Sequence, residues 1–136
     1  MKIVRPVTLA ALFCCGIAAG ADPSPKPPEP VVTTLMSAPM QNAPGKEALL
    51  LTVEYPPGGA DPVHRHDAGA LVYVLEGSIV MGVAGSEPVT LSAGQTFHEG
   101  PADVHTIGRN ASDTKPAKFV VFLVKDIGKP ALIPVD

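Results

Sequence analysis

Short apolar runs separated by turn-forming residues fill the chain after residue 30. Val, Leu, Ile and Phe recur in these runs, with Gly, Pro, Asn and Asp between them. This rhythm predicts an all-β barrel or sandwich with almost no helix. The predicted strands are Val31–Met36, Ala48–Tyr55, Leu71–Leu75, Ser78–Val83, Pro88–Leu91, Gln95–His98, His105–Arg109 and Ala117–Lys125.

Two of these strands carry more specific expectations. The run KFVVFLVK, residues 118–125, is unbroken in its apolar middle, which predicts a core strand covered on both faces. Side chains alternate between the two faces of a strand, and by this alternation Tyr73 points to the face opposite to that of His66. We therefore expect Tyr73 to be a core residue rather than part of the histidine site. The turns between strands contain residues suited to turns, such as Glu76-Gly77 and Gly100-Pro101.

The N-terminus has a different pattern from the rest of the chain. Lys2 and Arg5 precede an apolar run that ends in the small residues 19–21, which is typical of a cleaved signal peptide. The run is shorter than the about 20 residues that a membrane-spanning helix needs. We therefore expect residues 1–21 to be a signal peptide, residues 22–30 a Pro-rich linker and residues 31–136 one folded domain. The mature protein is then periplasmic or secreted, without a membrane span, and intact-mass analysis of an extracytoplasmic fraction tests this.

Cleavage changes the chemistry available to the mature chain. Cys14 and Cys15 both lie in the signal peptide, so disulfides, thiol nucleophiles and cysteine-bound zinc are excluded from the mature domain. The formal net charge of −3 becomes −5 when Lys2 and Arg5 are removed. An acidic protein of this kind is not expected to bind nucleic acid or anionic membranes.

Three of the four histidines lie beside Gly and Pro turns. His64 and His66 in the segment GGADPVHRH are two residues apart, so on a strand both imidazoles point to the same side. His105 in GQTFHEGPADVHTIGRN follows a second Gly–Pro turn and can supply a third imidazole. Three neutral imidazoles bind a divalent transition metal and leave coordination positions open. The sequence therefore predicts a metal site at His64, His66 and His105.

The two histidine segments together resemble the paired motifs of the cupin superfamily. Gly58, His64, His66 and Gly77 match the first motif in register, and Pro101, His105 and Asn110 approximate the second. The resemblance implies an antiparallel double-stranded β-helix, the jelly-roll cupin barrel. It also implies one metal ion, with iron(II) favoured over manganese, nickel or zinc, a small organic substrate or ligand, and a homodimer.

The chain departs from the family pattern at two positions. Ala70 stands where the family has a metal-binding Glu, and Asp103 replaces the Gly of the Pro-x-Gly turn, where we expect it to stay in the turn. Glu99 could replace the missing carboxylate, but a Glu beside a Gly–Pro turn is usually solvated. His98 is expected to be structural or pocket-lining. We also expect Glu76 to face water, and Arg109 and Asn110 to hold the following turn.

The resemblance leaves more than one function open. A three-histidine site favours an oxygen-dependent dioxygenase, although no residue of the sequence stands out as a general base. The alternatives are a non-catalytic protein that binds a small ligand and a metal-dependent isomerase or decarboxylase, since the fold alone does not distinguish them. An acid or base facing the cavity near the histidines would favour an enzyme.

Overall fold

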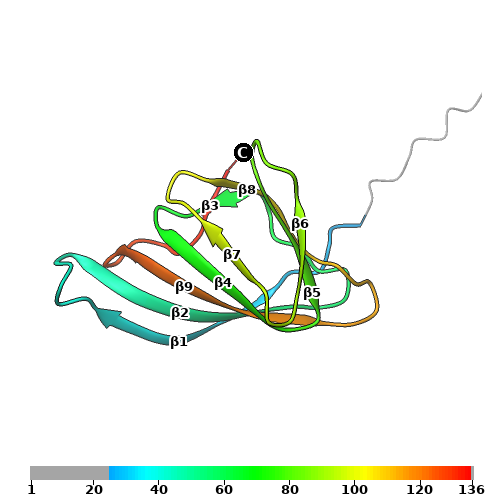
Figure 1. The fold of residues 1–136 in the computed structure, drawn as a ribbon, viewed down its shortest axis with the longest axis horizontal. Coiled ribbons are helices and arrows are strands. Elements are labelled where there is room, and N and C mark those ends of the chain that lie inside the picture. The colour runs from blue at the N-terminus through cyan, green and yellow to red at the C-terminus, as the bar shows by residue number, and fades with distance from the viewer. Residues whose placement is uncertain (1–24, 136) are drawn as a thin grey trace, which may run out of the picture.

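The computed structural model describes residues 25–135 as two antiparallel sheets, each of five strands. The predicted signal peptide lies outside these residues. One sheet has the order β1-β2-β9-β4-β7 and the other β10-β3-β8-β5-β6 (Figure 1). The strands are β1 (Val31–Pro39), β2 (Lys46–Tyr55), β3 (His64–Arg65), β4 (Gly69–Glu76), β5 (Ser78–Val83), β6 (Val89–Ser92), β7 (Thr96–Glu99), β8 (Val104–Asn110), β9 (Ala117–Asp126) and β10 (Ile133–Pro134).

The described residues are all-β, as the apolar rhythm predicts. Each of the eight predicted strands is present, with ends that differ by a few residues. The sequence pattern missed β3 and β10, which are two residues each and pair with one another. Strands this short show no periodicity of their own and form only through pairing with a neighbour. Residues 25–135 include no helix that is long and apolar enough to cross a membrane.

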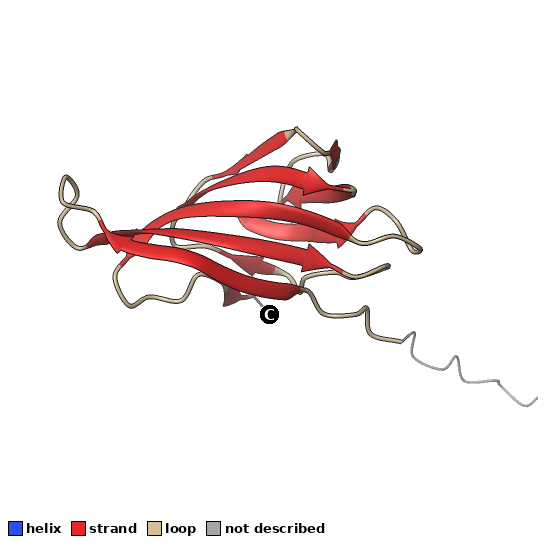
Figure 2. Ribbon diagram, turned by 90° about the horizontal axis from the view of Figure 1, so that it is seen from below, coloured by secondary structure: helices blue, strands red, loops and turns tan. Residues whose placement is uncertain are grey.

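The core lies between the two sheets. Side chains alternate along β2 and β9, so that Leu51, Val53, Phe119 and Val121 point inward and are buried, while their neighbours point outward. Figure 2 shows neighbouring strands as one continuous twisted layer, and Figure 1 shows β3, β8, β5 and β6 of the second sheet on the other side of the interior from β2 and β9. The histidine segments contribute β3 and β8 to this second sheet.

Two expectations about individual strands were wrong. Tyr73 is 47% exposed, because the inward positions of β4 are Ala70, Val72 and Val74 and Tyr73 points to the opposite side. Strand β9 is central in its sheet but alternates between buried and half-buried positions. Within the described residues its outer side has no second layer, so the apolar run is covered on one face only.

Candidate functional site

Four buried side chains converge on the space between the sheets. His64 lies on β3, His66 follows it, His105 lies on β8 and Glu99 ends β7. Their exposed fractions are only 3–9%. His64 and His105 are direct partners across the β3–β8 pair. Cross-strand partners point to the same face of a sheet, which brings together histidines 41 residues apart in the chain.

The three imidazoles form one cluster, as the sequence predicts. The ring centroid of His64 lies 4.9 Å from that of His66 and 5.0 Å from that of His105. The His66 and His105 rings are 6.5 Å apart, with Glu99 between them. The two-residue spacing of His64 and His66 therefore puts both rings on the interior side.

Glu99 is part of this cluster, so the expectation that it is solvated was wrong. Its Oε2 lies 3.2 Å from His66 Nε2 and its Oε1 lies 3.3 Å from His105 Nε2. In the β4–β7 pairing Glu99 is the direct partner of Ala70. Because such partners share a face, Glu99 supplies a carboxylate at the place left empty by the missing Glu of position 70. His98, one residue earlier, is exposed on the other face.

His66 and His105 have different electrostatic surroundings. Nδ1 of His66 is hydrogen-bonded to the Ala131 carbonyl, and its Nε2 faces Glu99. Burial favours the neutral ring, but the contacts with Glu99 and Ala131 outweigh burial and raise the pKa of His66. Burial lowers the pKa of His105, and the nearby His64 and His66 act in the same direction.

His105 has no hydrogen-bond partner for either ring nitrogen among the described residues. Its contact with Glu99 is close, but it lacks hydrogen-bond geometry. Buried polar atoms are nearly always satisfied, and a coordinated ion would satisfy one of these nitrogens. The unpaired ring is the observation that points most directly to an additional group at this place.

The donor set suits a divalent ion, but its side chains are not arranged as a finished coordination shell. The separations of 3.2 and 3.3 Å between Glu99 and the two rings match the roughly 3 Å between neighbouring donors on an ion with bonds of about 2.1 Å. In residues 25–135, however, no group of three or more His, Cys, Asp or Glu side chains is placed to hold an ion. The rings must therefore turn for coordination.

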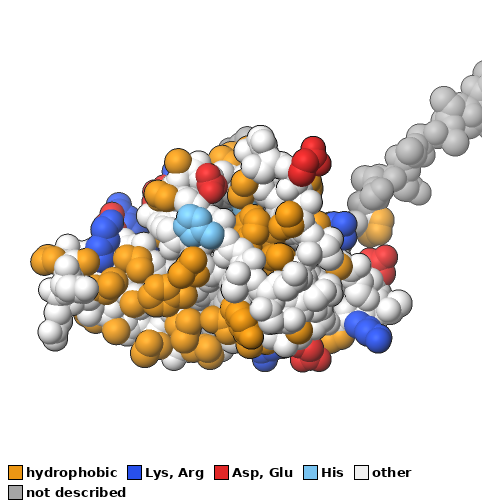
Figure 3. Space-filling view, viewed as in Figure 1, with side chains coloured by type: hydrophobic (Ala, Val, Ile, Leu, Met, Phe, Trp, Pro, Cys, Tyr) orange, Lys and Arg blue, Asp and Glu red, His pale blue; other side chains and the backbone are white. Residues whose placement is uncertain are grey.

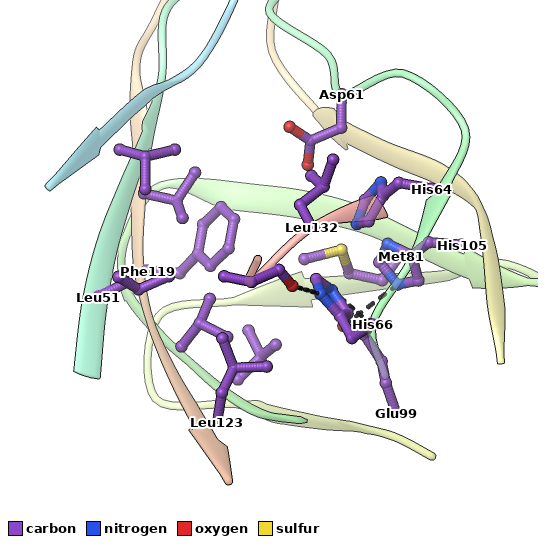
Figure 4. Close-up of a pocket in the computed structure, with 15 residues that line it drawn as sticks. Leu51, Asp61, His64, His66, Met81, Glu99, His105, Phe119, Leu123 and Leu132 are labelled. Atoms are coloured by element: carbon purple, nitrogen blue, oxygen red, sulfur yellow. Dashed lines mark hydrogen bonds and ion pairs between the residues drawn. The ribbon is translucent and has the colours of Figure 1, made fainter. Parts of the chain in front are cut away.

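The cluster lines a cavity of about 100 Å³ with one polar and one apolar side. Figure 4 shows His64, His66, His105 and Glu99 on one side, and Leu51, Phe119 and Leu123 on the other. This volume corresponds to a few water molecules or a small organic molecule. No Lys or Arg lines the cavity within the described part of the chain.

Sequence reasoning missed Asp61 and Tyr55. Asp61 lines the cavity, and its Oδ2 accepts a hydrogen bond from the Tyr55 hydroxyl. Burial raises the pKa of Asp61, although the Tyr55 hydrogen bond opposes the shift. Tyr55 is two residues after Val53 on β2, so the alternation of side chains indicates that it points inward. Nothing in the local sequence, however, indicates that the loop after β2 brings the Asp61 carboxyl next to the Tyr55 hydroxyl.

The expectations for Asp103, Asn110 and Glu76 are confirmed. Oδ2 of Asp103 accepts a hydrogen bond of 2.7 Å from the Gly100 N–H, which places Asp103 in the turn. Asn110 is buried and its amide donates to carbonyls of both adjoining loops, at Pro56 and Lys115. Glu76 is exposed at its hairpin.

These features define a small double-stranded β-helix with a histidine-lined cavity. The family model of the cupin domain matches residues 51–123, which is more than half of the chain. The chain therefore belongs to the cupin domain family. No curated protein matches its sequence.

Solved structures with the same fold differ widely in size. An uncharacterized protein with a double-stranded β-helix domain from Klebsiella pneumoniae is 19% identical, with a TM-score of 0.63, and the match covers 82% of this chain and 90% of that one. The DMSP lyase DddQ from Ruegeria pomeroyi is 20% identical with a TM-score of 0.58, over 65% and 43% of the two chains. An oxalate oxidase in complex with glycolate is 25% identical with a TM-score of 0.60, over 78% and 55%. The chain thus spans about half the length of these two enzymes.

Proposed function

We propose that this protein is an exported cupin that binds one divalent metal ion at His64, His66, His105 and Glu99 and acts on a small organic molecule. The observation that carries the proposal is the buried convergence of these side chains, in which neither nitrogen of His105 has a hydrogen-bond partner among residues 25–135. Three nitrogen donors and one oxygen donor suit iron(II), which we favour, as well as manganese, nickel or zinc. The predicted signal peptide supports the proposed export.

An enzymatic role is favoured over passive ligand binding. Asp61 is a cavity-lining acid near the histidines, which is the feature whose presence favours an enzyme. When bound, the ion supplies a Lewis acid and a template for substrate and oxygen. The residues of this chain hold the ion, exclude water through the apolar wall, and offer a carboxyl group to the substrate. We infer an oxygen-dependent dioxygenase reaction, with an isomerase or decarboxylase reaction as the alternative chemistry.

The test of the metal site is the metal content of purified variants, measured by elemental analysis. We expect about one ion per chain in the parent protein, and a loss of at least roughly tenfold in affinity for His64→Ala, His66→Ala and His105→Ala. The β-sheet circular dichroism signal should survive in each variant. His98→Ala is the matched control, because this histidine is exposed and should keep the parent's metal content. Full metal content in the three cluster variants would contradict the proposal.

The position of Glu99 permits a sharper test. Glu99→Ala should weaken metal binding, and the double variant Ala70→Glu/Glu99→Ala should restore it, because positions 70 and 99 face each other across β4 and β7. Ala70→Glu alone should not increase the metal affinity above that of the parent, since it buries a second carboxylate beside Glu99. A double variant that folds but stays as weak as Glu99→Ala would exclude Glu99 as a ligand.

Oxygen uptake by the iron-loaded protein, measured with a panel of small organic molecules, distinguishes a dioxygenase from a non-catalytic binding protein. We expect at least one compound to be consumed together with oxygen. Binding of compounds without uptake or conversion would favour the non-catalytic alternative.

A further inference from the structure

Asp61 is held in place by contacts that involve neither the histidines nor Glu99. Its backbone N–H donates to the Gly108 carbonyl at 2.8 Å, and its Oδ2 accepts the Tyr55 hydroxyl. Tyr55 is fully buried and packs edge-on against Phe119, with ring centroids 5.1 Å apart. The Asp61 carboxyl is therefore oriented by a side chain that cannot move without disturbing the core.

Gly108 makes room for this pair. A Cβ at position 108 would lie 3.0 Å from Asp61 Oδ2 and 3.0 Å from the Tyr55 hydroxyl oxygen, which is closer than side chains normally pack. Gly108 does not have a positive φ angle, so its backbone conformation does not require glycine. The absence of a side chain at this position is needed only to leave room for Asp61 and Tyr55. The local structure is thus built around the Tyr55–Asp61 hydrogen bond.

Asp61 also lies where a ligand would pass. Together with Val32 and Leu132 it lines both the cavity and an outer groove beside residues 26–30. Figure 4 shows Asp61 above His64, with its carboxyl next to Leu132. No hydrogen bond to its Oδ1 is formed by any of the residues 25–135.

We propose that Asp61 is a ligand-binding residue whose Oδ1 accepts a hydrogen bond from a small, uncharged molecule that carries a hydroxyl or amino group on a compact apolar body. This inference rests on the proposed function, because it takes the cavity to be the ligand site. The apolar wall of Leu51, Phe119 and Leu123 receives the body of the molecule. In the metal-free protein carboxylate ligands are disfavoured, because Asp61 and Glu99 repel an anion and no Lys or Arg of the described residues lines the cavity.

Three probes of similar shape test the proposal on metal-free protein: phenol, toluene, which lacks the hydroxyl, and benzoate, which is anionic. Dissociation constants come from NMR titrations of the cavity methyl groups. Asp61→Ala should lower the ratio of phenol to toluene affinity about tenfold, the value of a hydrogen bond to a charged acceptor. Asp113→Asn is the matched control, because Asp113 is exposed and outside the cavity, and it should leave the ratio unchanged.

Asp61→Asn removes the negative charge and the free acceptor but keeps the hydrogen bond with Tyr55. Its amide oxygen can accept the Tyr55 hydroxyl, which leaves the NH₂ group for the ligand. Phenol affinity should fall, and benzoate affinity should rise several-fold as the negative charge disappears. Gly108→Ala should reproduce the loss of phenol preference by pushing the Tyr55–Asp61 pair apart, and it serves if Asp61→Ala does not fold.

An unchanged phenol-to-toluene ratio in folded Asp61→Asn and Gly108→Ala would overturn the proposal. Loss of bound metal in Asp61→Asn would also overturn it, because Asp61 would then belong to the metal site. If the histidine variants show that no metal binds while the Asp61 effects persist, the metal proposal fails and the role of Asp61 stands.

Discussion

His66 and His105 face the same carboxylate but hold their protons differently. His66 has acceptors at both ring nitrogens, the Ala131 carbonyl and Glu99, whereas His105 has no hydrogen-bond partner in the described part of the protein. Burial disfavours charge on both rings, but only at His66 do its acceptors overcome that penalty and raise the pKa. The raised pKa thus favours the protonated form of His66 over that of His105 in the metal-free site.

Metal binding should release this proton. His66 must give up its Nε2 proton to bind an ion. At pH 6.5, the ordinary pKa of histidine, a ring with a raised pKa is more than half protonated, so we expect His66 to release more than half a proton per ion. Metal affinity should rise with pH until His66 is neutral. Calorimetric titration in two buffers of different ionisation enthalpy measures the release. Glu99→Gln should reduce it, since Glu99 helps to raise the pKa, and no proton release at this pH would contradict the assignment.

The same shift affects the stability of the metal-free protein. Because the folded-state pKa of His66 is raised, its contribution to stability is fully present below the unfolded-state pKa and is lost as pH rises through the folded-state pKa. His105, whose pKa is lowered, acts in the opposite direction and destabilises the fold as pH falls. The two effects partly cancel, so proton release is the more informative measurement.

At the scale of elements, the end of β8 is joined to the loop after β2 by a single side chain. The Asn110 amide donates to the carbonyls of Tyr55, Pro56 and Lys115 at 3.3, 3.0 and 2.8 Å, and its Oδ1 accepts from Ser112 N–H at 2.9 Å. This junction holds the base of the loop that carries Asp61, and it lies on the strand that carries His105.

Asn110→Ala should lower the free energy of unfolding by about 2–4 kcal/mol. The substitution removes the donor from one buried carbonyl, that of Tyr55, and from the partly buried carbonyls of Pro56 and Lys115, and a buried acceptor left unpaired costs about 1–3 kcal/mol before relaxation. Urea denaturation of the metal-free protein measures the change. Thr114→Ala is a suitable control, because its hydroxyl is exposed and, within the part of the chain that the structure describes, makes one weak hydrogen bond of 3.4 Å to the Ser112 hydroxyl. An effect of Asn110→Ala no larger than that of the control would show that water replaces the lost donor.

At the scale of the whole molecule, the outer face of the β1-β2-β9-β4-β7 sheet has a central band without charged side chains. The band includes Met36, Leu50, Thr52, Val120, Phe122, Leu71 and Tyr73, which are neighbours in the strand register. The ion pairs Lys46–Asp126 and Lys118–Glu54 border it at either end. Figure 3 shows hydrophobic side chains gathered over β2, β4 and β9. An uncharged centre with a charged rim is typical of a protein interface.

We predict that this band is the interface of the expected homodimer. The four strands of the band, at a spacing of about 4.8 Å and a length of about 26 Å, give on the order of 500 Å² in projection, which is more than half of the roughly 800 Å² that each partner of a stable complex buries. Leu71→Glu and Tyr73→Glu should give monomers in size-exclusion chromatography with light scattering. Val89→Glu, at an exposed position of the other sheet, should stay dimeric. A monomeric parent at micromolar concentration would contradict the prediction.

The sequence by itself determined the eight longer strands and the common direction of His64 and His66, because both depend on the local alternation of side chains. His105 joins this pair only through the long-range pairing of β3 with β8. The inward positions of β2 and β9 follow from that period, as does the common direction of His64 and His66. Where the outward side of a strand is also apolar, as at Tyr73, alternation alone did not show which side meets the core.

Only the tertiary structure decided the acidic part of the site. Glu99 enters the cluster because β7 pairs with β4 in the register that sets it opposite Ala70, and Asp61 meets Tyr55 because the loop after β2 is hydrogen-bonded to β8. Register between strands is a long-range property set by the whole core, and a shift of one residue would turn Glu99 to the outer face, where His98 now lies. Local sequence therefore predicts which side chains can share a face, whereas the pairing of distant strands decides which of them meet.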